Sequence, residues 1–447
     1  MSNNVQVVVL GAGCAGLTAA LQAHQIGKKV VVFEKMPQIG GNSKRASSGM
    51  NACETTTQLK NDIIDSADLF YKETFKAGGK LNDPALLSFF ASHTNGAIEW
   101  LKQFGVELTD LTTLGAMSRP RAHRPKDTSP VGAYLVNKLY DAVKKSNIPV
   151  YTDSKAISLK RTSSNEIQVT LNVEEKQYEV NCQSLILATG GFGASKELIK
   201  KYAPQYEDYK TTNQEGSTGD GLKLAQQLDA QLIQLDQVQI HPTVQQDNPH
   251  VYLIGETVRG EGAILVNTSG RRFVNELDTR KNVSNAIIAQ DTKHAFLILD
   301  QKVYQRVKAL AFYESIGLVE KAETLDELAT KIGIDSDNLQ STITNYNRQI
   351  ENDSEDEFKR HTGLKEINQG PFYGIHIAPA IHYTMGGIHI DDQCHVLDEN
   401  GDIVPGLLAA GEVTGGLHGN NRVGGNSIAE TIVFGRQAGI YACEHIK

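Results

Sequence analysis

The first 34 residues of this chain constrain its fold more than any other segment. Residues 5–10 (VQVVVL) are an almost uninterrupted apolar run, which is typical of a buried parallel strand. The glycine-rich turn 11–16 (GAGCAG) follows at once, residues 17–26 favour a helix, and residues 29–33 (KVVVF) favour a second strand that Glu34 closes. Strand, turn, helix, strand and acid in this order predict a Rossmann unit that binds a dinucleotide.

Each glycine of the turn has a physical role in such a unit. Gly11 permits the tight turn, Gly13 lets the backbone approach a pyrophosphate, and Gly16 lets the helix pack closely on the strand. The helix N-terminus presents free N–H groups to the phosphates. Glu34 lies 18 residues after Gly16, near the spacing of about 20 for an acid that binds a ribose hydroxyl. We expect further cofactor contacts from the neighbouring residues Ala12, Ala15 and Lys35.

Later glycine-rich segments favour FAD over NAD as the dinucleotide. The small-residue loops at 40–43 and 46–51 suit close approach to a flat ring system, because backbone donors there are free. Buried strands meet tight turns at 184–191 and 406–412, so both ends of the chain contribute to an extended cofactor site. We expect FAD contacts from Gly41, Asn42, Ser43, Ser48, Gly49, Met50, Asn51, Ala156, Ala188, Thr189, Gly190, Asp220, Glu412, Ser427 and Ile428. For Asp220, a helix-capping role is the alternative.

Length, charge and cysteine pattern exclude several classes of protein. With 447 residues, two domains are expected. The net charge of −8 argues against nucleic-acid and anionic-membrane partners. No apolar run of 18 residues appears and the first strand begins at residue 5, so we expect neither a transmembrane helix nor a signal or transit peptide. The five cysteines form no CxxC or CxxCH motif, so we expect no disulfide framework, metal site or c-type haem, and a cytoplasmic location.

Periodicity predicts the elements between these motifs. Helices are expected at 55–80, 84–104, 131–146 and 220–228, and antiparallel strands at 156–160, 166–173 and 178–180. The basic segment 118–125 (SRPRAHRP) is either a solvated loop or a phosphate contact.

The order of these elements predicts a discontinuous cofactor domain. Short strands with charged motifs occupy 236–300, and a polar helical block follows at 301–360. From His382 the chain returns to strand and glycine character. The predicted fold class is therefore α/β, with a Rossmann-like FAD-binding domain (1–236 and 381–447) interrupted by an α+β domain (237–380).

Charged residues recur in separate glycine-rich motifs of the second half. They are His241, Glu256, Arg259, Arg280, His382 and Arg422. Glu256 and Arg259 are three residues apart, near enough to pair on a helical turn, and Arg280 follows a short apolar run that favours a strand. Taken singly, each motif has an ordinary structural explanation, such as a turn or a surface ion pair that contributes about 0–1 kcal/mol. A merely solvated face has no need of glycine, so together they predict a cationic pocket for a small dianion.

Long stretches of the chain resemble one family of flavoproteins. They are GAGCAGL, GGNSKRASSGMNA, LATGGFG, DQVQIHPT, ETVRGEGAILVN, GRRFVNELDTR, HYTMGGI, AAGEVTGGLHGNNRVGGNSI and VFGRQAG. Over nearly its whole length the chain resembles the flavoprotein subunits of fumarate reductases and succinate dehydrogenases, above all the soluble fumarate reductases. The resemblance implies that residues 237–380 form a mobile clamp, or capping, domain over the flavin.

The resemblance also implies roles for the charged residues. Arg280 matches the arginine that protonates the substrate carbon, and Glu256 and Arg259 match its proton-delivery partners. His382 and Arg422 match the pair that grips one substrate carboxylate, and His241 matches a contact to the other. Thr257 and Gly425 are also expected at the substrate.

Two positions depart from relatives of this family. Several members have a threonine where this chain has Gly255, which removes one hydroxyl from the second carboxylate site and leaves substrates other than fumarate open. Membrane-bound members attach FAD through a histidine, and Ser43 aligns with that position, so we expect non-covalent FAD.

The expected reaction is reduction of fumarate to succinate, with hydride from flavin N5 and a proton from Arg280. Alternatives are reduction of another unsaturated acid, such as urocanate or an aryl acrylate, and a non-catalytic flavin subunit for electron transfer or sensing. Ile240, beside His241, offers no polar contact to the imidazole ring of urocanate, and a steroid substrate would not need so many cations. Because FAD uses the one fingerprint, we expect an external electron donor, either reduced flavin or a redox partner.

Overall fold

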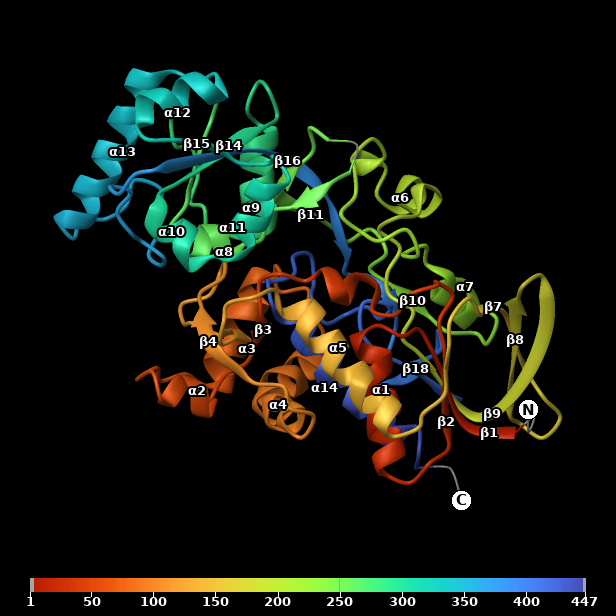
Figure 1. Cartoon of the computed structure of the whole chain (residues 1–447). Coiled ribbons are helices and arrows are strands. Elements are labelled where there is room, and N and C mark those ends of the chain that lie inside the picture. Colours follow the sequence, from red (N-terminus) through yellow and green to blue (C-terminus); the bar gives the residue numbers. More distant parts are fainter. Residues whose placement is uncertain (1–3, 249, 445–447) are drawn as a thin grey trace.

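In the computed structural model, the described residues 4–248 and 250–444 form two lobes (Figure 1). The lower lobe in the view contains both ends of the described chain, and the upper lobe is built from its middle. Within the described residues, no helix combines the length and the hydrophobicity needed to cross a membrane. The predicted fold class is confirmed, because a largely parallel sheet and a separate antiparallel sheet occupy the two lobes.

The lower lobe is organised by a sheet with strand order β18-β19-β9-β1-β2-β6. The strands are β1 (Asn4–Leu10), β2 (Val30–Phe33), β6 (Val150–Tyr151), β9 (Lys176–Leu187), β18 (His395–Leu397) and β19 (Ile403–Ala409). Strand β1 lies parallel between β2 and β9, and β19 pairs with the other edge of β9, with Leu407 opposite Leu185. The sheet therefore joins both ends of the chain, as a discontinuous cofactor domain requires.

A hairpin and two small sheets complete the strands of this lobe. They are β7 (Lys155–Arg161), β8 (Ile167–Val173), β3 (Met50–Asn51), β4 (Leu108–Thr112), β5 (Ala122–Pro125), β10 (Leu232–Ile233) and β17 (Gly387–Ile388). The predicted strand at 178–180 and the start of the predicted strand-and-turn segment 184–191 form one continuous strand, β9. Its first part pairs antiparallel with β8 and its last part pairs parallel with β1.

The helices of the lower lobe lie within residues 1–236 and 381–444. They are α1 (Cys14–Gln25), α2 (Thr56–Leu59), α3 (Ala67–Ala77), α4 (Pro84–Lys102), α5 (Val131–Lys145), α6 (Lys196–Tyr202), α7 (Asp220–Gln226) and α14 (Asn426–Tyr441), with short 3₁₀ turns at Gly41–Arg45 and Pro204–Tyr206. Helix α1 packs on the sheet that contains β1, and α5 and α14 pack on α1. The single helix predicted at 55–80 is wrong. The chain breaks at Asp62, whose φ of 57° is left-handed, and Ser66 caps a new helix by accepting a hydrogen bond from the Leu69 N–H.

The upper lobe contains the antiparallel sheet β12-β11-β16-β14-β13, with β15 on β16. Its elements are β11 (Val238–Gln245), β12 (Tyr252–Leu253), β13 (Ile264–Val266), β14 (Ala295–Leu299), β15 (Glu320–Ala322), β16 (Phe372–Thr384), α8 (Thr257–Gly260), α9 (Arg280–Ile288), α10 (Gln301–Arg306), α11 (Ala309–Ser315), α12 (Leu325–Ile332) and α13 (Ser336–Glu351). Two hydrophobic clusters lie inside this lobe. Strands β11 and β16 continue toward the lower lobe, where Ile240 and Ile381 join its core. The domain limits at 237 and 380 stay a prediction.

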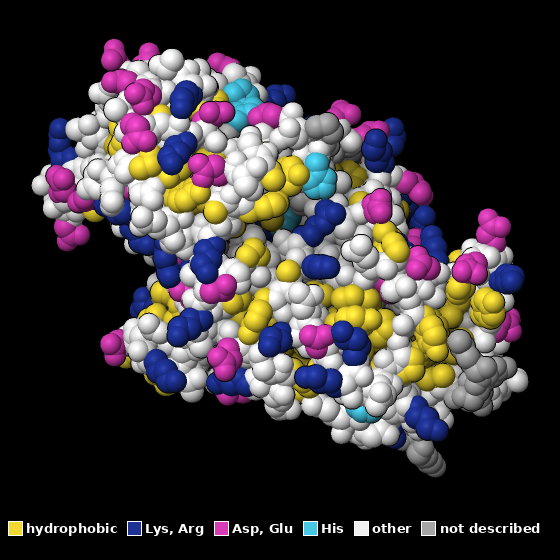
Figure 2. All heavy atoms as spheres, viewed as in Figure 1, with side chains coloured by type: hydrophobic (Ala, Val, Ile, Leu, Met, Phe, Trp, Pro, Cys, Tyr) yellow, Lys and Arg dark blue, Asp and Glu magenta, His cyan; other side chains and the backbone are white. Residues whose placement is uncertain are grey.

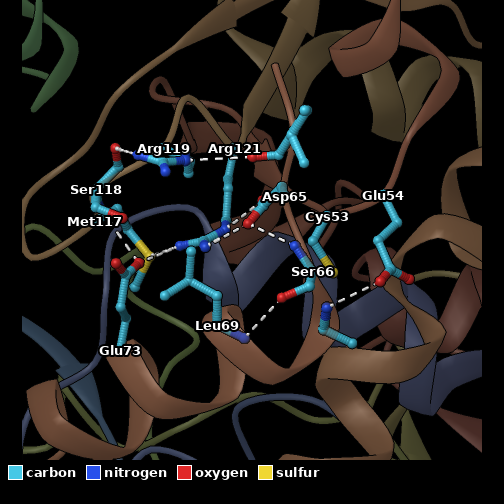
Figure 3. A network of polar contacts seen from close by, with 12 residues as sticks. Cys53, Glu54, Asp65, Ser66, Leu69, Glu73, Met117, Ser118, Arg119 and Arg121 are labelled. Atoms are coloured by element: carbon cyan, nitrogen blue, oxygen red, sulfur yellow. Dashed lines mark hydrogen bonds and ion pairs between the residues drawn. The ribbon is translucent and has the colours of Figure 1, made fainter.

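The solvated-loop interpretation of the basic segment 118–125 is wrong for residues 121–125, which are buried, although Ser118 and Arg119 are exposed. The phosphate contact stays a prediction. The second half of the segment is the buried strand β5, and Arg121 is only 1% exposed. The Arg121 guanidinium lies between the carboxylates of Asp65, at 2.7 Å, and Glu73 (Figure 3). Arg124 similarly binds Asp110 and Glu261. These arginines are buried because acidic residues from other segments pair with them, and no local pattern reveals those partners.

Candidate active site

Two glycines of the turn after β1, Gly11 and Gly16, have no room for a side chain. A Cβ on Gly11, whose φ is 104°, would lie 2.3 Å from the Ala188 carbonyl oxygen, and one on Gly16 would lie 1.9 Å from the Gly11 carbonyl oxygen. Glu34 at the end of β2 accepts hydrogen bonds from the N–H groups of Ala12 (2.8 Å) and Met36 (2.9 Å). These two hydrogen bonds hold the turn in place. Because a carboxylate has about four acceptor positions, Glu34 can still accept a hydrogen bond from a ribose hydroxyl.

One cavity of about 740 Å³ begins at this turn and extends to the boundary between the lobes. Of the residues predicted to contact the cofactor, those on its wall are Gly11, Gly13, Ala15, Glu34, Lys35, Gly41, Asn42, Ser43, Ser48, Gly49, Ala156, Ala188, Thr189, Gly190, Asp220, Glu412, Ser427 and Ile428. Its wall also includes Lys44, Arg45 and Lys308, and Figure 2 shows Lys and Arg side chains along the boundary between the lobes. A cavity that joins the glycine turn to small-residue loops fits an extended dinucleotide such as FAD.

Four predicted cofactor residues lie behind the cavity wall. They are Ala12, Gly16, Met50 and Asn51. The Asn51 amide donates to the Gly424 carbonyl oxygen and to the Asn426 side chain, both at 2.7 Å, so it fixes the loop before α14.

Asp220 and Ser43 are held by polar contacts within this wall. Asp220 binds Lys35 at 2.8 Å, whereas the cap of α7 is Gly219, so the capping alternative for Asp220 is wrong. Ser43 accepts a hydrogen bond from the Cys14 N–H at 3.2 Å. Both side chains therefore tie the cavity wall to the Rossmann unit.

At the other end of the cavity, Glu256 lies between two arginines. Arg280 donates from Nε to Glu256 at 2.7 Å and from Nη1 to Gln239 at 3.2 Å. The Arg259 Nη2 atom is 3.9 Å from the same carboxylate, so the predicted Glu256–Arg259 pair is the looser of the two. The Gly115 N–H of the lower lobe donates to the other oxygen of Glu256 at 2.6 Å. The prediction that Arg280 directly follows a strand is wrong. Arg280 is the first residue of α9, and Thr279 caps that helix.

These contacts set the charge of the Glu256–arginine group. Burial alone would raise the pKa of Glu256, but Arg280, Arg259 and the Gly115 N–H outweigh it and lower the pKa to about 2. Burial, with repulsion from Arg280, lowers the pKa of Arg259 to about 10 although Glu256 opposes this shift. Glu256 is therefore an anion at neutral pH, held between guanidinium groups in a site with almost no solvent.

His241, His382 and Arg422 bring donors to the same end of the cavity. The two imidazole rings are 5.0 Å apart, and the Arg422 guanidinium lies 4.3 Å from the centre of the Tyr383 ring. His241 Nδ1 accepts the Thr243 N–H at 3.2 Å, which assigns the proton to Nε2. His382 Nδ1 contacts the Thr212 hydroxyl at 2.7 Å.

Several donors of this cluster are buried without a hydrogen-bond partner among the described residues. They are His241 Nε2, Arg259 Nε and Nη2, and Arg422 Nε. A buried donor without a partner costs about 1–3 kcal/mol, and more when it is charged. Burial, with Arg280 and the neighbouring charged groups, lowers the pKa values of both histidines well below 6.5, and burial lowers the pKa of Arg422 to about 10. Of the residues that hold these donors, Arg422 lines the cavity, so a small anion there would meet a buried cation directly.

The structure brings most of the predicted substrate and catalytic residues together. Arg280, His382, Arg422 and Gly425 line the cavity, while Glu256, Arg259 and His241 stand directly behind them. Thr257 does not line the cavity, because its hydroxyl donates to the Ser48 carbonyl oxygen at 3.4 Å.

Sequence reasoning missed Gln239 and the close fit around Glu256. Gln239 accepts from Arg280 and donates to the Arg422 carbonyl oxygen at 2.8 Å, so it links the two arginines. Strand alternation places residue 239 on the same face as His241, which is a signal that the sequence contains. A Cβ on Gly424 would lie 2.6 Å from Glu256 Oε2, so a side chain at position 424 would collide with the Glu256 carboxylate. Nothing local in the sequence predicts that contact.

Comparisons with known proteins agree with this geometry. The family model described as FAD binding domain matches residues 6–428. The chain is 44% identical over 443 residues to a protein of Klebsiella pneumoniae named NADH:fumarate oxidoreductase, covering 99% of this chain and 48% of that protein. It is 39% identical to a Shewanella frigidimarina protein named fumarate reductase (cytochrome), covering 100% of this chain and 78% of the relative. The chain thus spans about half the length of the Klebsiella relative.

A solved structure has the same fold. It is the open conformation of a flavocytochrome c3 fumarate reductase, with a TM-score of 0.80 and 36% identity, covering 99% of this chain and 79% of the other. The likeness extends over both lobes, because nearly the whole chain is matched.

Proposed function

The chain belongs to the FAD binding domain family, and from that membership we propose that it reduces fumarate, or a closely similar unsaturated dicarboxylate, to the saturated acid. One observation carries the proposal. Arg280, His382 and Arg422, from distant parts of the chain, line one end of a cavity whose other end is the glycine turn of a dinucleotide site. The names of the relatives support the same substrate class.

FAD is the cofactor, and the wall of the cavity fits it. Gly11, Gly13 and the N-terminus of α1 would hold the pyrophosphate, and Glu34 a ribose hydroxyl. Burial raises the pKa of Glu412 to about 7, although the Thr384 N–H (3.2 Å) and the Asn42 amide (3.3 Å) donate to it. We assign Glu412 to a hydroxyl of the cofactor chain. With Ser43 in the loop, attachment is non-covalent.

FAD, when bound, supplies a hydride to one carbon of the substrate double bond. Arg422 and His382 bind one carboxylate, and His241 Nε2 donates to the other. As the hydride arrives, negative charge moves toward a carboxylate held by these donors. They therefore stabilise the transition state more than the ground state.

Arg280 protonates the adjacent carbon. A new C–H bond forms there while an N–H bond of Arg280 breaks, so the product has gained one hydride and one proton. A guanidinium is ordinarily a very weak acid, but a carbon that carries developing negative charge is a much stronger base. Arg259 then gives a proton to the Glu256 carboxylate, which passes it to Arg280 through the 2.7 Å contact, and Arg259 regains its proton from solvent. A carboxylate with a pKa of about 2 passes such a proton on without retaining it.

Other features belong to the same proposal. Residues 237–380 act as the clamp that closes over the substrate, and the Gly115–Glu256 hydrogen bond joins the two lobes. An external donor, reduced flavin or a redox partner, supplies electrons. The five free, buried cysteines fit a reducing cytoplasmic compartment. Ile240 belongs to the lower-lobe core and does not line the cavity, so it does not decide between fumarate and urocanate.

Turnover by the purified protein tests the proposal. With bound FAD and reduced viologen, we expect succinate to form from fumarate, and Arg280→Met to abolish turnover while FAD remains bound. Arg271→Met is the matched control, since this exposed arginine of the same segment bonds to Asn338 at 2.8 Å and should be neutral. Bound FAD without turnover of any unsaturated acid would refute the proposal and favour the electron-transfer or sensing alternative.

A further inference from the structure

Ser47 occupies the space that a side chain at position 255 would need. A Cβ built on Gly255 would lie 2.6 Å from Ser47 Oγ and 3.3 Å from Ser47 Cβ. The backbone of Gly255 is not in the left-handed region, so lack of space, and not strain, opposes a side chain there. The loop at 46–51 and the segment before α8 therefore meet at one small volume. A hydroxyl at this place can come from residue 47 or from a side chain at position 255.

The Ser47 hydroxyl is buried and has no hydrogen-bond partner among the described residues. Its neighbours are already engaged. Tyr313 accepts the Gly255 N–H at 3.4 Å and donates to the Leu253 carbonyl oxygen at 3.0 Å. Ser47 also lines the cavity together with Arg280 and His382. A buried hydroxyl ordinarily finds a partner, so this one is available to a molecule in the cavity.

The hydroxyl also lies at the correct end of the cavity. Gly255 is joined directly to Glu256, whose carboxylate binds Arg280 at 2.7 Å. Ser48, the next residue, is fixed differently, because its carbonyl oxygen accepts the Thr257 hydroxyl. Thr257 is thereby engaged away from the cavity, whereas the Ser47 hydroxyl lies against Gly255, next to Glu256, and lines the cavity without a hydrogen-bond partner among the described residues.

We propose that Ser47 is a substrate-binding residue that donates a hydrogen bond to a carboxylate of the dianion, and that it supplies the hydroxyl which Gly255 lacks. This inference rests on the proposed function, because it requires an unsaturated dicarboxylate in the cavity. It assigns the second carboxylate to a mixed set of donors, the Ser47 hydroxyl and the His241 N–H. It also explains how a chain with glycine at position 255 still recognises two carboxylates.

A double-mutant cycle tests the assignment. Ser47→Ala removes the donor, and a hydrogen bond to a charged group is worth enough that the KM for fumarate and the Kd for succinate should rise about tenfold or more. The Kd is measured by titrating succinate against the absorbance of the oxidised flavin, which needs no turnover. Crotonate, with one carboxylate, should show little change. Ser92→Ala, an exposed serine on α4, is the control.

The second half of the cycle restores the hydroxyl from the opposite side. Gly255→Thr alone should weaken succinate binding. The new Cβ would lie 2.6 Å from Ser47 Oγ, which is too close, so the Ser47 hydroxyl must move. Combined with Ser47→Ala, the threonine fits and should return the Kd to within about threefold of the parent. If the parent turns over fumarate and Ser47→Ala leaves the Kd for succinate unchanged, the assignment of Ser47 is wrong but the proposed function stands. A parent that neither turns over fumarate nor binds succinate overturns the proposed function as well.

Discussion

Replacing Glu256 by glutamine allows two roles of this residue to be measured separately: its contribution to the free energy of unfolding and its contribution to kcat for fumarate. The substitution keeps the shape of the side chain and removes its charge. Glu256 is 1% exposed, accepts Arg280 at 2.7 Å and the Gly115 N–H at 2.6 Å, and lies 3.9 Å from Arg259. Glu256→Gln therefore leaves two buried guanidinium groups without their shared anion.

The size of the effect follows from the pKa of Glu256. Its fall from 4.5 to about 2 corresponds to about 3 kcal/mol in favour of the charged form, at about 1.4 kcal/mol per pH unit. Because the folded-state pKa lies below the ordinary value, this stabilisation is present at neutral pH and is lost only as pH falls from 4.5 toward 2. We expect Glu256→Gln to lower the free energy of unfolding at pH 7 by about 3 kcal/mol, measured by urea denaturation.

Catalysis should suffer more specifically. If Glu256 returns protons to Arg280, kcat for fumarate should fall about 10²- to 10⁴-fold, while succinate binds at least as tightly because the pocket gains positive charge. Stopped-flow reoxidation of the reduced flavin and steady-state turnover measure this loss.

Glu261→Gln is the matched control for this experiment. Glu261 is 4% exposed and binds Lys365 at 2.8 Å and Arg124 at 3.0 Å, but it does not contact Arg280. The Glu261→Gln variant should have a lower free energy of unfolding and an unchanged kcat. A Glu256→Gln enzyme with kcat within about twofold of the parent would refute the proton-delivery reasoning.

Three further outcomes follow from the same contacts. Arg422→Met should raise the Kd for succinate by on the order of 100-fold, because a buried charged donor is lost, with FAD content unchanged by absorbance. Arg121→Met should cost about 3–5 kcal/mol in urea denaturation, because the buried Asp65 carboxylate loses its cation and the partly exposed Glu73 loses its partner, while kcat of the folded enzyme is retained. His241 and His382 have pKa values well below 6.5, so the unfolded chain binds protons that the folded chain does not. The melting temperature without dicarboxylate should therefore fall as pH drops below about 6.5, and succinate should oppose that fall.

Local sequence predicted the cofactor end of the molecule well, because its determinants are contiguous. The turn from Gly11 to Gly16 and the acid Glu34 lie within one βαβ unit. Gly11 has a left-handed φ, Gly16 leaves no room for a Cβ, and Glu34 binds the N–H of Ala12 in the same turn. The α/β fold and the FAD cofactor were predictable for the same reason, and the resemblance to known flavoproteins extended this across the chain.

Sequence reasoning failed where a side chain depends on a distant partner. Arg121 looked like part of a surface loop because Asp65 and Glu73 lie on or near another helix. Glu256 seemed paired with Arg259, three residues away, but its closest cation is Arg280, 24 residues away, and the Gly115 N–H comes from the other lobe. The sequence also does not reveal the importance of Ser47, because it depends on a close contact between Ser47 and Gly255, 208 residues away.

The central claim is that donors from distant segments bind one dianion beside the flavin. A crystal structure of the oxidised, FAD-bound protein with succinate tests it most directly. We predict one carboxylate within hydrogen-bonding distance of Arg422 and His382, the other at His241 and Ser47, and Arg280 next to a methylene carbon. Succinate bound elsewhere, or Arg280 and Arg422 facing away from the ligand, would contradict the account.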